Sequence, residues 1–153
     1  MAIVCLEGPS AVGKTTTCQQ LEEDYGAYII PEVNLLFERP KNEHKTWYLE
    51  RQVERWNMAV RQSKNYEIVI LDGDVFQPLS YNWCFHFGIF DQPLSFLEEF
   101  YKKSMMKREI GFPDQYFYLY TTDSELRKRK DFDYTRKRRN FEKHIHIVKA
   151  HKE

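Results

Sequence analysis

Short apolar runs alternate along the chain with longer segments in which apolar residues recur every three or four positions. Short runs between turn residues are typical of buried strands, whereas the longer recurrence is typical of amphipathic helices. We therefore expect strands at residues 3–6, 27–30, 67–71 and 116–120. Because helical segments separate these strands, the pattern predicts an α/β fold with a mostly parallel sheet covered on both faces.

The helical pattern is strongest between residues 43 and 64, where Leu49, Val53, Trp56 and Val60 fall on one face. Further helices are expected at residues 15–25, 79–87, 93–108, 124–130 and 135–149. The sequence contains no internal repeat, linker or low-complexity tract. We therefore expect residues 1–153 to form one domain with three layers, α/β/α.

A glycine-rich segment, Gly8-x-x-x-x-Gly13-Lys14-Thr15, joins the first expected strand to the first expected helix. This spacing in a strand–turn–helix context is the signature of a phosphate-binding loop. The alternative is an ordinary glycine-rich turn, but both glycines, the lysine and the hydroxyl all fall at the required positions. The residues expected to bind the nucleotide are Gly8, Ser10, Ala11, Val12, Gly13, Lys14, Thr15 and Thr16.

Each part of this loop has a physical role. Its glycines let the backbone turn tightly and direct N–H groups inward, and the following helix adds its unpaired N–H groups and positive dipole end. Lys14 is expected to reach the outer phosphates, and the Thr15 hydroxyl to bind Mg²⁺. The sequence therefore predicts a binding site for a nucleoside triphosphate.

Composition narrows the class of protein but does not name a partner. The formal net charge is zero and no apolar run approaches membrane-spanning length, so neither a membrane nor nucleic acid is expected as a partner. Cys5 and Cys18 fall in an expected strand and helix without metal-ligand spacing, and we expect buried free thiols. The five histidines show no metal-ligand spacing either. A cytoplasmic protein is the expectation.

Acidic residues follow the second and third expected strands. The carboxyl ends of parallel strands meet at one edge of a sheet, where ligands bind. Glu32 is placed to accept a proton from an acceptor hydroxyl or to bind Mg²⁺ through water, the alternative being a solvated loop residue. Asp72 is the candidate metal-binding acid and Asp74 the candidate substrate contact, although one of the two could be only a cap.

The segment from residue 127 to residue 139 carries eight of the 23 lysines and arginines. It could be a solvated basic face or a nucleic-acid patch. Beside a phosphate-binding loop, however, it is interpreted as a lid whose arginines stabilise the transferred phosphoryl group. Arg129 and Arg136 are the favoured catalytic residues, and Asp131 and Asp133 argue against a plain nucleic-acid patch.

Gln52 and Arg55 lie three residues apart on one side of the helix expected at residues 43–64. Such a pair could hold a polar, planar substrate. The alternative is that both side chains belong to the solvent-exposed face of the helix.

With these residues identified, the chain resembles small P-loop kinases, the group that holds thymidylate kinases, deoxynucleoside kinases and chloramphenicol phosphotransferase-like enzymes. Glu7-Gly8-Pro9 before Gly13-Lys14-Thr15-Thr16 is similar to the EG-x-x-G-x-GK-S/T-T opening of the first two families. Pro31-Glu32 stands where deoxynucleoside kinases carry their catalytic acid, and the basic segment stands where these kinases carry their lid. The resemblance implies a nucleoside-monophosphate-kinase-like P-loop fold, with ATP and Mg²⁺ as cofactors.

Two features depart from these families. They usually place an arginine directly after the acid that ends the third strand, whereas this chain has Asp72-Gly73-Asp74. They also close the sheet with a fifth strand, whereas no apolar strand follows the last expected helix here. We expect either a shortened variant of the fold or a second chain, as in a homodimer, that completes this edge of the sheet.

The sequence thus predicts an ATP- and Mg²⁺-dependent kinase that transfers the γ-phosphate to a small molecule, with a nucleoside or nucleoside monophosphate as the favoured acceptor. One alternative is a kinase for another hydroxyl compound, such as an antibiotic or a metabolite. The other is a non-catalytic, nucleotide-binding regulatory protein.

Overall fold

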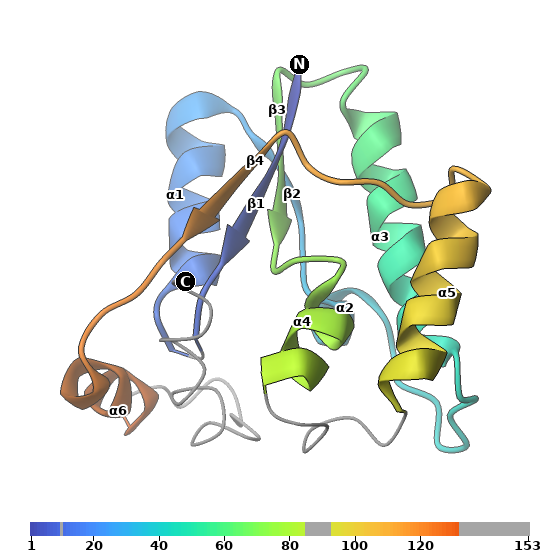
Figure 1. Ribbon diagram of the computed structural model, residues 1–153. Coiled ribbons are helices and arrows are strands. Elements are labelled where there is room, and N and C mark those ends of the chain that lie inside the picture. The colour runs from blue at the N-terminus through green and yellow to red at the C-terminus, as the bar shows by residue number, and fades with distance from the viewer. Residues whose placement is uncertain (10, 85–92, 132–153) are drawn as a thin grey trace.

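The computed structural model describes residues 1–9, 11–84 and 93–131 (Figure 1). Its four strands each overlap an expected strand, and every described pairing is parallel in the order β2-β3-β1-β4. The strands are β1 (Ala2–Glu7), β2 (Tyr28–Ile30), β3 (Ile68–Asp72) and β4 (Gln115–Tyr118). The predicted α/β fold with a parallel sheet is confirmed.

Helices connect each strand to the next, which lets the chain return and begin the next strand in the same direction (Figure 1). The helices are α1 (Lys14–Tyr25), α2 (Val33–Leu36), α3 (Trp47–Gln62), α4 (Gln77–Cys84), α5 (Leu94–Met106) and α6 (Asp123–Asp131). The single turn of α2 was not predicted, and α3 begins later than the expected residue 43. The helix expected at residues 135–149 lies outside the described residues.

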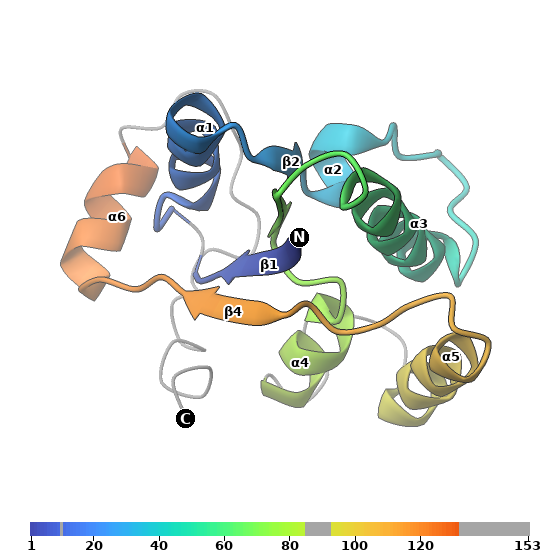
Figure 2. The same ribbon diagram turned by 90° about the horizontal axis from the view of Figure 1, so that it is seen from above.

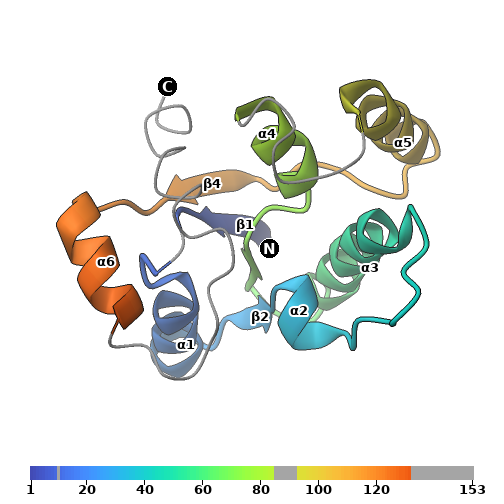
Figure 3. The same ribbon diagram turned by 90° about the horizontal axis from the view of Figure 1, so that it is seen from below.

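The side chains of β1 and β3 alternate between two apolar layers. Ile3, Cys5 and Val69 belong to the core cluster that also contains side chains of α3 and α5, whereas Leu6 and Ile70 pack with side chains of α1. Figures 2 and 3 show α1 on one side of the sheet and α3 and α5 on the other. The described chain therefore has the three layers that the sequence predicts.

Cys5 and Cys18 are buried free thiols, as expected. Burial, the largest cause, raises the pKa of Cys18 to about 12 and also raises the pKa of Cys5. Since the thiolate is the reactive form of cysteine, neither side chain is prepared for nucleophilic chemistry.

The strand register brings the carboxyl ends of three strands to one edge of the sheet. Leu6 of β1 lies opposite Asp72 of β3, and Ile30 of β2 lies opposite Leu71. The Gly73 N–H donates to the Leu6 carbonyl at 2.9 Å, which ties the chain beyond β3 to β1. The residues that follow these strands therefore share one edge with the glycine-rich loop.

Tyr101 of α5 tests the packing of the α3–α5 layer. Its hydroxyl is buried and donates to the Val75 carbonyl at 2.7 Å. Tyr101→Phe keeps the ring but leaves that carbonyl unpaired, so the free energy of unfolding should fall by about 1–2 kcal/mol. Urea denaturation measures the loss, with Tyr25→Phe at the exposed end of α1 as the control. Equal losses in the two variants would contradict this assignment.

Candidate functional site

The backbone of the glycine-rich loop has the conformation that its glycines permit. Gly8 and Gly13 have φ angles of 156° and 101°, which side-chain-bearing residues rarely adopt. A Cβ atom at Gly8 would lie 2.4 Å from the Leu119 carbonyl oxygen, so only glycine fits there. Helix α1 begins at Lys14, and no side chain of the described residues caps its N-terminus. Its first N–H groups thus remain available to an anion.

Two buried apolar residues of the loop pack against α6. Ala11 and Val12 form a small cluster with Leu126 of α6, and Leu119 packs against it. Ala11 has a φ angle of 68°, in the left-handed region that favours glycine. It occupies the place of the second glycine in the kinase opening. The cluster therefore holds the loop in a conformation that alanine alone does not favour, while Ser10 lies outside the described residues.

Lys14 connects the loop to the acidic strand ends. Its Nζ atom donates to the Gly8 carbonyl at 2.9 Å and lies 4.0 Å from Glu32 Oε1. The side chains of Lys14 and Glu32 are 10% and 24% exposed. The predicted loop lysine and the predicted base are thus brought together, and Glu32 is not the solvated loop residue of the alternative interpretation.

Asp72 and Thr15 form the pair that the sequence predicts for a metal. The Thr15 hydroxyl donates to Asp72 Oδ2 at 2.8 Å, and Asp72 is 1% exposed. Burial and then the charge of Glu32 raise the pKa of Asp72, against the hydrogen bond from Thr15 and the charge of Lys14. Asp72 Oδ1 is buried and has no hydrogen-bond partner among the described residues. A hydroxyl oxygen beside an unsatisfied carboxylate oxygen fits Mg²⁺, which prefers oxygen ligands.

Mg²⁺ sites in phosphotransferases use one or two protein oxygens together with substrate phosphates, not a full protein cage. The described part of the chain contains no group of three or more His, Cys, Asp or Glu side chains arranged as a metal site.

Glu7 is a candidate functional residue that the sequence analysis did not predict. Its Oε1 atom accepts the Gly8 N–H at 2.8 Å and its Oε2 atom accepts the Asp74 N–H at 3.0 Å. One carboxylate thus joins the first residue of the loop to Asp74, two residues beyond the end of β3. The only sequence signal was its place in the kinase opening.

Asp74 lies beside Glu7 in a partly buried position. Burial and then the charge of Glu7 raise the pKa of Asp74 to about 6. The Tyr116 hydroxyl of β4 donates to Asp74 Oδ1 at 3.4 Å. The structure therefore places this candidate substrate contact at the same strand edge as Asp72, on the side of β1 and β4.

Gln52 and Arg55 do not lie on the solvent-exposed face of α3. Each is 1% exposed, so that alternative is wrong. Arg55 donates to Gln52 Oε1 at 2.7 Å and to main-chain carbonyls of Pro31, Asp72 and Gly73. The predicted pair therefore faces the strand ends from inside the protein, and contact with a substrate stays a prediction.

Arg129 of α6 contacts the loop backbone. Its Nη1 atom donates to the Val12 carbonyl at 2.9 Å, and its Nε atom donates to Glu125 Oε1 at 3.1 Å. The described part of the predicted lid, residues 127–131, is thus helical and adjacent to the glycine-rich loop. Arg136 and residues 132–139 lie outside the described residues.

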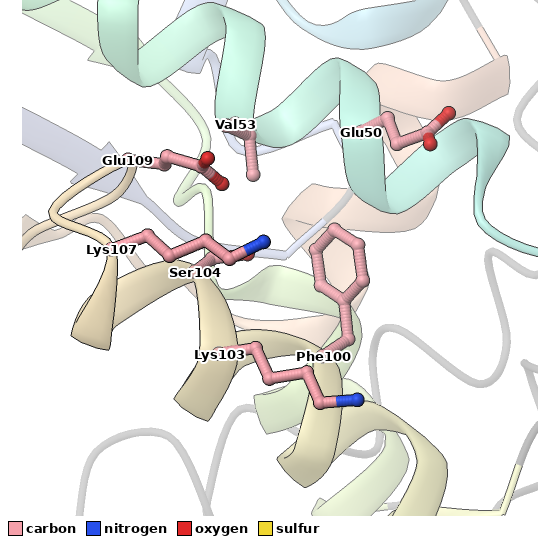
Figure 4. A pocket seen from close by; sticks show the side chains of 7 residues that line it. All are labelled: Glu50, Val53, Phe100, Lys103, Ser104, Lys107 and Glu109. Atoms are coloured by element: carbon pink, nitrogen blue, oxygen red, sulfur yellow. The ribbon is translucent and has the colours of Figure 1, made fainter.

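A cavity of about 250 Å³ lies elsewhere, between α3 and α5 (Figure 4). Val53, Phe100 and Ser104 form part of its lining, together with lysine and glutamate side chains. None of the predicted site residues lines it, so it does not belong to the strand-end site.

No family model and no curated protein sequence matches the chain. Solved structures do match. Deoxyadenosine kinase from M. mycoides with bound dATP is similar with a TM-score of 0.55 and 17% identity, covering 99% of this chain and 86% of that chain. Thymidylate kinase from Ehrlichia chaffeensis has a TM-score of 0.53 and 18% identity, covering 99% and 88%. The chain has the fold of P-loop nucleoside and nucleotide kinases.

A second structure of the mycoides kinase, with the products dCMP and a flexible dCDP, agrees with this fold at a TM-score of 0.56. Its identity is 15%, and the match covers 97% of this chain and 82% of that chain. The fold expected from the resemblance is confirmed. None of the described helices has the length and apolar character needed to cross a membrane.

The raised pKa of Asp74 predicts a pH-dependent cost to stability. Since its pKa is about 6 in the folded protein against 3.8 ordinarily, the folded state binds the proton more tightly. The stability that this proton contributes is full below about pH 4 and is lost as the pH rises through about 6. Asp74→Asn should therefore unfold with a free energy up to about 3 kcal/mol higher than the wild type at pH 7.5, and with no gain at pH 4.

Urea denaturation at the two pH values, in buffer containing a metal chelator, measures this difference. Asp24→Asn, on the exposed surface of α1, is the control for the substitution itself. A difference between Asp74→Asn and wild type that is the same at both pH values would contradict the assignment.

Proposed function

We propose that the chain is an ATP- and Mg²⁺-dependent phosphotransferase that moves the γ-phosphate to a nucleoside or nucleoside monophosphate. The observation that carries this proposal is that the glycine-rich loop contacts the acids at the strand ends. Lys14 Nζ lies 4.0 Å from Glu32 Oε1, and the Thr15 hydroxyl donates a hydrogen bond to Asp72. A phosphate cradle, an oxygen pair for a metal and a carboxylate base are the parts that phosphoryl transfer requires. The similar fold of deoxyadenosine and thymidylate kinases supports the choice of acceptor.

In the proposed reaction, the loop N–H groups and the α1 N-terminus bind the β- and γ-phosphates. Lys14 leaves the Gly8 carbonyl to neutralise charge on the γ-phosphoryl group. Thr15 and Asp72 would hold Mg²⁺, which supplies charge neutralisation and alignment of the phosphates when bound. These residues do not change covalently, because phosphoryl transfer depends mainly on alignment and electrostatic stabilisation.

Glu32 acts as the base at the acceptor. With a nucleoside acceptor, the hydroxyl oxygen forms a bond to the γ-phosphorus, its proton passes to a Glu32 carboxylate oxygen, and the bond to the β,γ-bridging oxygen breaks with its electron pair. A nucleoside monophosphate would attack through an ionised phosphate oxygen, with the same bond breaking and no proton passing to Glu32. ADP is the leaving group. Arg129 in α6 and Arg136 are the proposed lid cations, and Asp74 is the proposed acceptor contact. The sequence also predicts acceptor contacts for Gln52 and Arg55. A cytoplasmic location and a homodimer remain predictions.

Lys14→Ala tests the donor side. Because Lys14 is the loop's only side-chain cation, its loss should lower phosphate transfer from ATP by at least about a hundredfold while the fold is retained. Coupled measurement of ADP release, with a panel of nucleosides, nucleoside monophosphates and unrelated hydroxyl compounds as acceptors, gives the rate. Lys64→Ala, at an exposed position after α3, is the control. Undiminished transfer by Lys14→Ala would remove the kinase proposal.

Glu32→Gln tests the acceptor side. The amide keeps the shape of the side chain but cannot take the proton, so kcat with a nucleoside acceptor should fall by about a hundredfold or more. Nucleotide affinity, measured by calorimetry, should change little, because the donor binds through the loop. Glu38→Gln, exposed beyond α2, is the control. A comparable loss of affinity and rate would instead assign Glu32 to the metal or to the fold.

A further inference from the structure

Arg55 is the largest fully buried side chain among the described residues, with 1% exposure. Charged side chains are almost never fully buried unless their charge and donors are satisfied, because removing them from water is costly. Within the described residues Arg55 takes part in no ion pair within 4 Å. Its partners are five oxygen atoms, four of which belong to the main chain.

These main-chain oxygens belong to the ends of two strands. Nε donates to the Pro31 carbonyl at 2.8 Å, beyond β2. Nη2 donates to the carbonyls of Asp72 and Gly73, each at 2.9 Å, at the end of β3, and more distantly to Ile30 at 3.4 Å. The planar guanidinium can serve both strands at once because its donors point in fixed, different directions.

The hydrogen bonds of Arg55 lie at the point where the β2–β3 ladder ends. The β2–β3 ladder ends at the pair Ile30 and Leu71, so the residues beyond it have no ladder bonds to fix their spacing. Pro31 directly precedes Glu32, and Gly73 directly follows Asp72. Arg55 thus continues the connection between the strands at the point where the two acids leave the sheet.

Gln52 completes the arrangement from one turn earlier on α3. Its Oε1 atom accepts Nη1 of Arg55 at 2.7 Å, and its own side chain is 1% exposed. This contact orients the guanidinium plane toward the strand ends. The helix therefore supplies both the donor group and the residue that orients it.

We propose that Arg55 is a positioning residue that sets the separation of Glu32 and Asp72 by binding the main chain beside each of them, with Gln52 orienting its guanidinium. This role replaces the expected contact between Arg55 and the acceptor. Its effect on turnover rests on the proposed function, whereas the connection between the strand ends does not.

Arg55→Lys is the first variant, because it keeps the charge but replaces the planar fork with a single ammonium that cannot serve both strand ends. Amide hydrogen exchange of the free protein should become at least about tenfold faster in residues 30–36 and also in 71–75, both of which the guanidinium now holds. Arg61→Lys, at an exposed position on the same helix, is the matched control and should change neither segment. Unchanged exchange at either strand end would overturn the proposal.

Kinetics separate positioning from substrate contact. A displacement of the acids of about 1 Å should lower kcat by about a hundredfold, with the acceptor KM and the nucleotide affinity within about threefold of wild type. A raised acceptor KM with kcat unchanged would instead assign Arg55 to the substrate and overturn the proposal.

A milder variant keeps the test decisive if Arg55→Lys fails to fold. Gln52→Leu removes only the orienting oxygen, and faster exchange at both strand ends is again expected; exchange unchanged from wild type would overturn the proposal. If the wild type transfers no phosphate to any acceptor, the proposed function fails. The exchange measurements still decide whether Arg55 holds the strand ends.

Discussion

Four carboxylates gather at the carboxyl ends of three adjacent parallel strands: Glu7, Glu32, Asp72 and Asp74. Burial and then the charges of neighbouring carboxylates raise the pKa of Asp72 and of Asp74, so holding these groups ionised at one edge of the sheet opposes folding. Lys14 and Arg55 offset this repulsion, as do the main-chain N–H groups that Glu7 accepts. The carboxylates thus lie beside a loop of main-chain N–H donors. A complex of a metal ion with phosphates could bind to both, the metal to the carboxylates and the phosphates to the N–H groups.

The elements that the sequence predicted well are those whose signals are local. The apolar run of β1, the glycine spacing and the start of α1 are all contained in residues 2–25, so their pattern is sufficient to place them. The acids Glu32 and Asp72 could be placed near the loop because parallel strands end at a common edge. Their distance from Lys14 and Thr15 depended on the strand register, which the sequence does not show.

Side chains with long-range partners were not predictable in the same way. Polar residues on a helix are ordinarily interpreted as solvent-exposed, yet Gln52 and Arg55 are among the most buried residues of α3. Arg55 donates to main-chain carbonyls at the ends of β2 and β3, which carry no side-chain signal in the sequence, and Gln52 accepts from Arg55. Glu7 likewise binds two N–H groups, one of them 67 positions away along the chain. Such contacts become visible only when the strands are assembled.

The backbone conformation between Asp72 and Asp74 favours glycine at position 73, and this bears on how the proposed acceptor could be recognised. Gly73 has a φ angle of 87°, so a side chain there would be strained, in keeping with the absence of the arginine that the similar kinases usually carry. Its N–H binds the Leu6 carbonyl and its carbonyl accepts Arg55, which fixes both sides of the turn. The guanidinium at this strand end therefore comes from α3 and is occupied by the main chain. In the proposed reaction, recognition of an acceptor at this edge would therefore rely on the carboxylates and on side chains of other elements.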